Sequence, residues 1–166
     1  MYPDTDYDVV VVGGGPAGST VGALLADAGR KVLVIDREKF PRFRVGESLM
    51  PATYWTLERL GVLDQMKCSS FPNKHSVQFF AKNGEAAAPY YFSRVNQHES
   101  SQTWQVDRRD FDHMLLKNAA AKDADVFEQV RVHDVLFDGN RAMGIRAEFK
   151  NGVKKAITAK VIVDAT

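Results

Sequence analysis

The chain has 166 residues, of which 45% are hydrophobic and 26% are charged, as is ordinary for a globular domain in water. Its formal net charge of +1 excludes the strongly basic surface that nucleic-acid binding needs, and its single cysteine, Cys68, excludes an internal disulfide. No apolar run approaches the roughly 20 residues of a transmembrane helix, and the N-terminus lacks a signal-peptide pattern, so we expect a cytoplasmic protein.

The first predicted element is a strand that contains four consecutive valines, residues 9–12. Such a β-branched run is typical of a strand buried on both faces of a parallel sheet. Gly13, Gly15 and Gly18 follow directly, in the spacing G-x-G-x-x-G. The next apolar residues recur at three- and four-residue steps and predict a helix that ends at Gly29. Its predicted apolar face consists of Ala17, Val21, Leu24, Leu25 and Ala28.

A second predicted strand, residues 31–35, ends on Asp36 and completes a β-α-β unit. In such a unit the first glycine allows a sharp turn, the second lets a pyrophosphate approach the backbone, and the third lets the helix pack closely on the sheet. The helix N-terminus attracts phosphate, and an acidic residue about 20 positions further on can accept hydrogen bonds from a ribose. An empty loop is the alternative, but the ordered parts predict a dinucleotide site made of Gly13, Gly15, Pro16, Ala17, Gly18 and Asp36.

A basic loop follows at residues 37–44 and contains Arg37, Arg42 and Arg44. Arg42 and Arg44 alternate with Phe40 and Phe43, so we expect both arginines on one side of an extended segment. Beyond the carboxyl ends of the first two strands, they would lie near the dinucleotide phosphates. The alternative is a solvated basic loop.

In the middle of the chain a predicted hairpin interrupts the α/β pattern. Pro51 stands at the start of a predicted helix that stops at Gly61, and residues 62–66 predict a further helical turn. Residues 75–81 and 86–92 then predict two strands joined by a turn at Asn83-Gly84. We interpret residues 71–102 as an insertion that begins a β-rich substrate lobe, and residues 1–70 and 103–166 as one nucleotide-binding domain.

After a short predicted strand at residues 104–106, Asp107 caps a predicted helix that begins at Arg108. Its apolar face contains Phe111, Met114, Leu115 and Ala119. A third parallel strand is predicted at 124–127 and a β-meander at 129–137, 142–149 and 154–158, followed by another strand of the main sheet at 160–163. We expect the meander to cover one face of the sheet and assign it no chemistry. Because the last residues form a strand that runs into a loop, we expect the N-terminal part of a longer protein.

These segments together resemble a known family. The sequences GGGPAGS, VLVIDR, FPRFRVGESLMP, WQVDRRDFD and VIVDAT are similar to those of FAD-dependent oxidoreductases with the p-hydroxybenzoate hydroxylase fold. That group includes aromatic hydroxylases, geranylgeranyl-reductase-like enzymes and flavin-dependent halogenases, and FPRFRVGESLMP resembles the halogenase-like branch most specifically. The resemblance implies an α/β fold class, with a Rossmann-like FAD-binding domain, a β-meander and the start of a substrate lobe, and FAD as the dinucleotide.

The resemblance also implies roles for single residues. The glycine loop and Asp36 would hold the ADP half, and Arg44 with Arg42 would reach the ribityl-pyrophosphate region. Arg108 would steady the cofactor as well. The flavin side of the cavity would be lined by Gly46, Glu47 and Ser48, and Asp164 and Ala165 would begin the family's second FAD loop, D-A-S/T-G.

Lys74 is the one candidate catalytic residue. The segment Phe71-Pro72-Asn73-Lys74 resembles the one that carries the essential lysine of flavin-dependent halogenases. An ammonium can donate a hydrogen bond to a halogenating agent, and burial can lower its pKa toward a nucleophilic amine. The alternative is a surface lysine before a hairpin. His75 and His98 lack metal-ligand spacing with other candidate ligands, so we expect no metal site.

Three functions remain on the sequence alone. The first is a flavin-dependent halogenase that uses reduced FAD, O2 and halide on a small aromatic or pyrrolic substrate, free or carrier-bound, with a separate flavin reductase as partner. The second is a monooxygenase that takes hydride from NAD(P)H directly, or a geranylgeranyl-reductase-like enzyme. The third is a non-catalytic FAD-binding module.

Overall fold

The computed structural model describes Pro3 and residues 6–166, and these residues divide into two compact units. The first unit comprises Met1–Arg44 and Arg108–Thr166, and the second comprises Val45–Asp107. The second unit is longer at both ends than the insertion predicted at residues 71–102. The assignment of that insertion to a substrate lobe stays a prediction.

The first unit is built on a six-stranded sheet with the order β7-β2-β1-β10-β9-β8. The neighbours β7, β2, β1 and β10 run parallel, whereas β10, β9 and β8 are antiparallel. This arrangement confirms the predicted parallel sheet with an attached meander. The strands are β1 (Asp6–Val12), β2 (Val32–Asp36), β7 (Asp125–Glu128), β8 (Val130–Asp138), β9 (Arg141–Phe149) and β10 (Lys154–Asp164).

Strand β10 corrects one detail of the prediction. The last meander strand and the returning strand of the main sheet were expected as separate elements, but they form one strand of 11 residues. Its first half, from Lys154 to Thr158, pairs with β9, and its second half, from Thr158 to Asp164, pairs with β1. A strand has two hydrogen-bonding edges, so it can serve both partners without an intervening turn.

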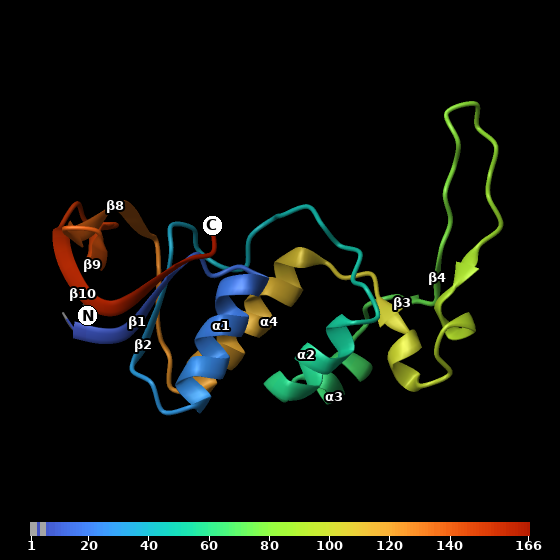
Figure 1. Ribbon diagram of the computed structural model, residues 1–166, viewed down its shortest axis with the longest axis horizontal. Coiled ribbons are helices and arrows are strands. Elements are labelled where there is room, and N and C mark those ends of the chain that lie inside the picture. Colours follow the sequence, from blue (N-terminus) through green and yellow to red (C-terminus); the bar gives the residue numbers. More distant parts are fainter. Residues whose placement is uncertain (1–2, 4–5) are drawn as a thin grey trace. The chain divides into compact units, whose positions relative to one another are not determined.

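The parallel strands are covered on both faces, which explains why β2 is buried at all five positions. Helices α1 (Pro16–Asp27) and α4 (Arg108–Ala121) lie side by side on one face (Figure 1). On the other face the meander covers the sheet, as predicted. The shared core contains Tyr7, Val10, Leu33 and Ile35 from the parallel strands, and Val130, Ile145, Ala147, Phe149 and Ile157 from the meander and β10.

Helix α1 ends near Gly29, which has a φ of 73° as a C-terminal glycine should, but its buried face is not the predicted one. Of the five predicted face residues, Ala17 and Ala28 are exposed, and Val21, Leu24 and Leu25 are only partly buried. The buried residues are the small ones, Gly18, Ser19, Gly22, Ala23 and Ala26. The reason is steric, since a Cβ on Gly22 would lie 2.5 Å from Val34 Cγ2. The helix lies so close to the sheet that only small residues fit between them.

The second unit contains short elements. Helices α2 (Thr53–Leu60) and α3 (Leu63–Lys67) confirm the two predicted helical segments, and Gly61 ends α2 with a φ of 74°. Strand β3 (Asn73–Lys74) pairs with β6 (Thr103–Trp104), and β4 (Ser76–Val77) pairs with β5 (Tyr90–Tyr91). Two 3₁₀ helices, Phe92–Arg94 and Glu99–Ser101, complete this unit.

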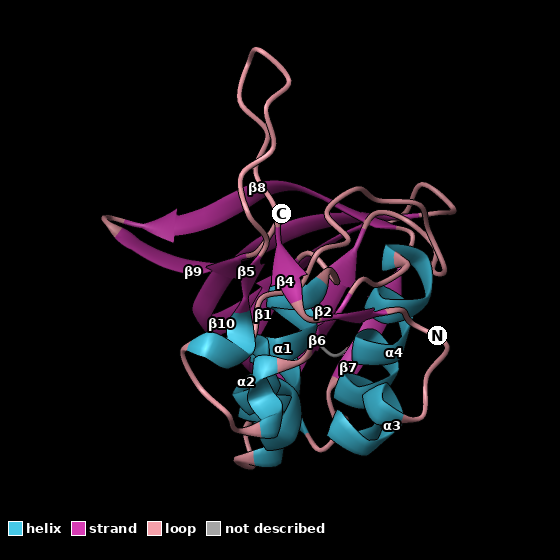
Figure 2. Ribbon diagram, turned by 90° about the vertical axis from the view of Figure 1, so that its right-hand side faces the viewer, coloured by secondary structure: helices cyan, strands magenta, loops and turns pink. Residues whose placement is uncertain are grey.

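The predicted hairpin is present, but its strands are much shorter than expected. Pairing is limited to β4 with β5 and to one isolated bridge between Phe80 and Ala86, although the chain turns back at Asn83-Gly84 as predicted. The two arms extend from β4 and β5 as a long loop (Figures 1 and 2). Phe79 and Phe80 are 69% and 68% exposed, so burial contributes little to the pairing of these arms. No helix in the described part of the chain is long and apolar enough to span a membrane.

Candidate cofactor site and the surroundings of Lys74

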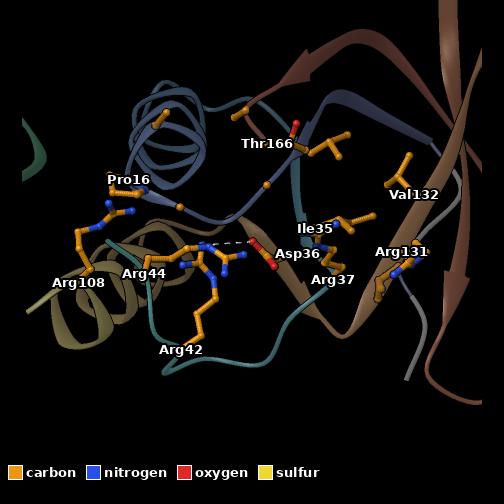
Figure 3. Close-up of a pocket in the computed structure, with 16 residues that line it drawn as sticks. Pro16, Ile35, Asp36, Arg37, Arg42, Arg44, Arg108, Arg131, Val132 and Thr166 are labelled. Atoms are coloured by element: carbon orange, nitrogen blue, oxygen red, sulfur yellow. Dashed lines mark ion pairs between the residues drawn. The ribbon is translucent and has the colours of Figure 1, made fainter. Parts of the chain in front are cut away.

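A cavity of about 590 Å³ lies in the first unit, where β1 and β2 end and α1 begins. Figure 3 shows Arg42, Arg44 and Arg108 on one side of this cavity and Arg131 and Val132 on the other. Of the predicted cofactor-binding residues, the structure brings ten together in its wall: Gly13, Gly15, Pro16, Ala17, Asp36, Arg37, Arg42, Arg44, Arg108 and Ala165.

The three glycines of the loop meet different steric demands. Gly13 has a φ of 107°, and a Cβ there would lie 2.5 Å from the carbonyl oxygen of Ala165. A Cβ on Gly18 would lie 1.8 Å from the carbonyl oxygen of Gly13, so a side chain at that position cannot be accommodated without moving the backbone. At Gly15 the nearest atom is Arg42 Nη2, 3.5 Å away. Gly15 is therefore not required by the protein's own packing, which leaves room for a ligand.

The backbone N–H donors at the N-terminus of α1 face the open position at Gly15. Gly15 is the N-cap residue, and Pro16 and Ala17 follow it in the cavity wall. In the described part of the chain, no side chain caps the helix by hydrogen bonding, and its first turn contains no acidic residue. Unpaired N–H groups and the positive end of the helix dipole are thus available to an anion.

Asp36 ends β2 with a buried carboxylate that also shapes the glycine loop. Its Oδ2 accepts a hydrogen bond from the Gly14 N–H at 2.8 Å, and its Oδ1 accepts one from the Glu38 N–H at 2.8 Å. A carboxylate offers about four acceptor positions, so these two bonds leave capacity for hydroxyl donors. Ribose binding by Asp36 stays a prediction.

Arg42 and Arg44 lie on the same side of their segment, as predicted, since both line the cavity and both contact Glu38 Oε2. Arg42 contacts three carboxylates: Nη1 is 3.0 Å from Asp112 Oδ2, Nε is 3.2 Å from Glu38 Oε2, and Nη2 is 3.7 Å from Asp36 Oδ2. The contact with Glu38 is an ion pair without an aligned hydrogen bond. Arg44 Nη2 lies 2.9 Å from the same Glu38 oxygen. These contacts hold the basic loop in place as part of the cavity wall.

Sequence reasoning missed two parts of this site. Asp112 is completely buried and accepts hydrogen bonds from both Arg42 and Arg108. Its spacing of four residues from Arg108 on a predicted helix was the available signal. The meander, to which we assigned no chemistry, contributes Val130, Arg131 and Val132 to the wall. Strand β8 reaches this wall because it begins immediately after β7, at the carboxyl end of the parallel strands.

The charge of the cavity fits a diphosphate. Five of its lining residues are arginines, namely Arg37, Arg42, Arg44, Arg108 and Arg131, and Asp36 is its one acidic lining residue among those the structure describes. Guanidinium groups match phosphate oxygens in both geometry and charge. With the helix N-terminus and the open position at Gly15, the residues present suit the pyrophosphate of a dinucleotide.

The second loop predicted for the cofactor follows β10. The Ala165 N–H donates to the Val12 carbonyl at 2.8 Å, which places this loop against the glycine loop. Asp164 Oδ1 accepts hydrogen bonds from the Thr166 N–H at 3.1 Å and from its hydroxyl at 2.8 Å. These hydrogen bonds lower the pKa of Asp164 below its ordinary value.

Lys74 lies in the second unit among uncharged partners. Its Nζ donates to Ser48 Oγ at 2.6 Å and to the Leu49 carbonyl at 3.0 Å, and it lies 5.4 Å from the centroid of the Phe92 ring. Burial lowers the pKa of Lys74 below its ordinary value of 10.5. The structure thus brings Lys74 and Ser48 together, although the sequence predicts different roles for them.

Backbone pairing holds Lys74 beside the segment that contains Ser48. Strand β3, which carries Lys74, pairs with β6, and the Leu49 N–H donates to the Trp104 carbonyl at 3.1 Å. The Val106 N–H donates to the Glu47 carbonyl at 2.8 Å, and Gly46 has a φ of 107°. Gly46, Glu47 and Ser48 all belong to the second unit. Their predicted place beside the flavin stays a prediction.

An apolar cavity of about 570 Å³ lies in the same unit. Its wall includes Met50, Val77, Phe79, Tyr90 and Phe92. Phe92 is also the ring against which the Lys74 ammonium packs. The amine and the apolar cavity therefore share one side chain, that of Phe92, although Lys74 itself does not line the cavity.

Fold and site together define a nucleotide-binding α/β protein of the FAD type. A family model described as "FAD binding domain" matches residues 6–165, so this chain belongs to that family, and FAD is its cofactor. The charge of the first unit's cavity and its open position at Gly15 agree with this cofactor.

Comparison with individual relatives narrows the class of FAD-binding protein. The chain is 36% identical, over 98% of its length, to a 1H-pyrrole-2-carbonyl-(peptidyl-carrier protein) chlorinase of Pseudomonas fluorescens, of which it spans 40%. It resembles the structure of the myxobacterial chondrochloren halogenase CndH with a TM-score of 0.92 and 41% identity over 98% of this chain and 38% of that one. A flavoprotein/dehydrogenase from Cytophaga hutchinsonii is similar as well, with a TM-score of 0.86 and 38% identity over 96% of this chain and 39% of that one.

Proposed function

We propose that this chain is the FAD-binding part of a flavin-dependent halogenase that uses reduced FAD, O2 and halide. The observation that carries the proposal is the environment of Lys74: an amine with a lowered pKa, uncharged partners and an adjacent apolar cavity. The similarity to a pyrrolyl-carrier-protein chlorinase and to the chondrochloren halogenase supports it. We propose a small aromatic or pyrrolic substrate, free or bound to a carrier protein.

Within this proposal each unit has its own task. Gly15, the N-terminus of α1, Arg42, Arg44 and Arg108 hold the diphosphate, and Asp36 holds the ribose of the ADP half. Gly46, Glu47 and Ser48 line the flavin side. Bound reduced FAD, together with O2, supplies the oxidising power that turns halide into an electrophilic halogenating agent.

Lys74 then holds that agent for the substrate. The hydrogen bonds to Ser48 and Leu49 keep Nζ at a defined position, and its lowered pKa increases the fraction of neutral amine. A neutral amine can donate a hydrogen bond to the agent or react with it as a nucleophile. Since FAD must arrive reduced, we also propose a separate flavin reductase as partner.

The experiment is a halogenation assay of the full-length protein with reduced FAD, O2 and chloride or bromide, using pyrrole and phenol substrates. Lys74→Met should abolish halogenation while the Kd for FAD stays unchanged. Lys82→Met is the matched control, because Lys82 is exposed in the hairpin turn, and it should retain full activity. Halogenation that persists in Lys74→Met would overturn the role of the lysine.

A second candidate is a flavoprotein oxidoreductase that takes hydride from NAD(P)H, and the similarity to the Cytophaga flavoprotein/dehydrogenase favours it. The two functions differ in their response to anaerobic NADPH. Direct bleaching of the flavin absorption by NADPH would favour the second candidate. A flavin that NADPH alone does not bleach, but that an added reductase with NADPH does, would favour the halogenase.

A further inference from the structure

The buried carboxylate of Asp112 joins two arginines of the cofactor cavity. Arg108 makes a two-point contact with it, Nε to Oδ1 at 2.6 Å and Nη2 to Oδ2 at 3.0 Å. Arg42 approaches from the basic loop, with Nη1 3.0 Å from the same Oδ2. Asp112 is 0% exposed, whereas the side chains of Arg42 and Arg108 keep 10% and 16% of their surface and line the cavity.

Burying a carboxylate is costly unless charged donors satisfy it, and here two guanidinium groups do so. The contacts restrain both arginines, because each would leave a buried charge less well paired if it turned away. Arg42 Nη2 is also the atom nearest to the open position at Gly15, 3.5 Å from a Cβ built there. The contact with Asp112 therefore positions Arg42 beside the place that the glycine loop leaves for a phosphate.

We propose that Asp112 is a positioning residue for FAD: it holds Arg42 and Arg108 in the orientation in which they bind the diphosphate, without touching the cofactor itself. This inference rests on the proposed placement of FAD in the first unit's cavity. Flexible arginines lose side-chain entropy when they bind a ligand, and a residue that already restrains them lowers that cost.

Whether the Kd for FAD rises or falls when Asp112 is replaced distinguishes a positioning role from a purely electrostatic one. Asp112 is an anion close to a cationic cavity, so on Coulomb's law alone its removal would strengthen the binding of the negatively charged FAD. If Asp112 positions the arginines, its removal weakens FAD binding in spite of that gain. A purely structural role would weaken the binding of every ligand of the cavity alike.

The experiment measures the Kd for FAD of the full-length protein by flavin fluorescence, with ADP and adenosine as competitors. In Asp112→Asn we expect the Kd for FAD and the inhibition constant for ADP to rise about tenfold, the loss of about one charged hydrogen bond, while that for adenosine, which lacks the diphosphate, stays unchanged. A Kd for FAD that falls or stays the same, or an equal loss for all three ligands, would overturn the proposal.

Asp110→Asn is the matched control. Asp110 lies in the first turn of the same helix with a side chain that is 60% exposed, and its charge pairs at 3.6 Å with the exposed Arg109. The same chemical change there should leave all three ligands unaffected. If Asp112→Asn does not fold, Arg42→Lys and Arg108→Lys decide the matter, since each keeps the positive charge but loses the planar fork. A Kd for FAD that neither lysine variant changes would overturn the proposal.

A variant at Gly15 separates this inference from the site on which it rests. If Gly15→Val does not weaken FAD binding, the cavity itself is not the diphosphate site. If Gly15→Val weakens FAD binding and Asp112→Asn does not, the cavity is the diphosphate site, but Asp112 does not position the arginines for it.

Discussion

The cofactor cavity of the first unit and the surroundings of Lys74 in the second unit hold their cationic side chains in opposite ways. In the first, Arg42 and Arg108 lie against carboxylates, and Asp112 joins them in a buried network. In the second, the described partners of Lys74 are a hydroxyl, a carbonyl and an aromatic ring, and burial lowers its pKa. Paired guanidinium groups keep their charge and their orientation, which suits the binding of a diphosphate. An amine without a carboxylate partner gives up its proton more readily, which suits chemistry.

The structural elements that carry the two sites differ as well. The cavity of the first unit lies at the ends of a covered parallel sheet and a helix of 12 residues. Lys74 stands on a strand of two residues, near a hairpin whose aromatic side chains are largely exposed. Binding of a ligand with fixed geometry benefits from a rigid, closely packed frame. The following predictions test this difference between the units.

The largest effect is expected at Gly18, where the frame of the first unit is tightest. Gly18→Ala places a Cβ 1.8 Å from the Gly13 carbonyl oxygen, so the backbone must move, and we expect a loss of about 3 kcal/mol in the free energy of unfolding. Urea denaturation measures this loss. Gly15→Ala is the control, because Gly15 has a φ of −70° and a Cβ there would meet Arg42 Nη2 at an ordinary contact distance of 3.5 Å, and it should unfold like the unsubstituted protein.

The next effect concerns ligand binding rather than stability. Gly15→Val fills the open position beside Arg42 Nη2, so we expect the Kd for FAD to rise about a hundredfold, equal to about 2.7 kcal/mol. Fluorescence titration measures the Kd, and urea denaturation should show unchanged stability. A variant that unfolds easily would mean that Gly15 serves packing, and the contrast with Gly18 would be lost.

Removal of a paired arginine should affect both properties. Arg42→Met leaves Asp112 and Glu38 without one cationic partner, and we expect a loss of about 2 kcal/mol in the free energy of unfolding together with weaker FAD binding. Arg109→Met is the control, because the side chain of Arg109 is 57% exposed and its Nε lies 3.6 Å from the equally exposed carboxylate of Asp110. Equal stability of Arg42→Met and Arg109→Met would show that the buried network does not stabilise the fold.

The smallest effect is expected at Lys74, as a dependence of stability on pH. The pKa of Lys74 is lowered in the folded protein, so between that pKa and about 10.4 the unfolded chain binds more protons than the folded one. Stability should therefore rise with pH across this window, and the cost of burying the charge is fully present below it. Lys74→Met should remove this rise and be slightly more stable at neutral pH.

Urea denaturation between pH 7 and pH 10 measures the difference between Lys74→Met and the unsubstituted protein. The exposed Lys82 provides the control, and Lys82→Met should keep the pH dependence of the original chain. A difference between the two lysine variants that does not change with pH would contradict the assignment of a desolvated amine to Lys74.

The local patterns of the first unit were predictable because they depend on neighbours in sequence. The valine run, the glycine spacing and Asp36 predict a β-α-β unit, and the structure places them as β1, α1 and β2. The spacing of two residues between Arg42 and Arg44 likewise predicts a shared side, since alternate residues of an extended segment face the same way. The face of α1 was not predictable by hydrophobicity, because the close approach of helix to sheet selects small residues over large ones.

The sequence by itself thus determined the class of fold, the nucleotide site at the end of the first strands, and the residue types that surround a diphosphate. Only the tertiary structure decided that Arg42 and Asp112, 70 positions apart, share a buried ion pair, that β8 forms part of the cavity wall, and that Lys74 bonds to Ser48. The physical reason is that periodicity and backbone geometry are local properties. Pairing of buried charges depends on which distant segments the packed core brings together.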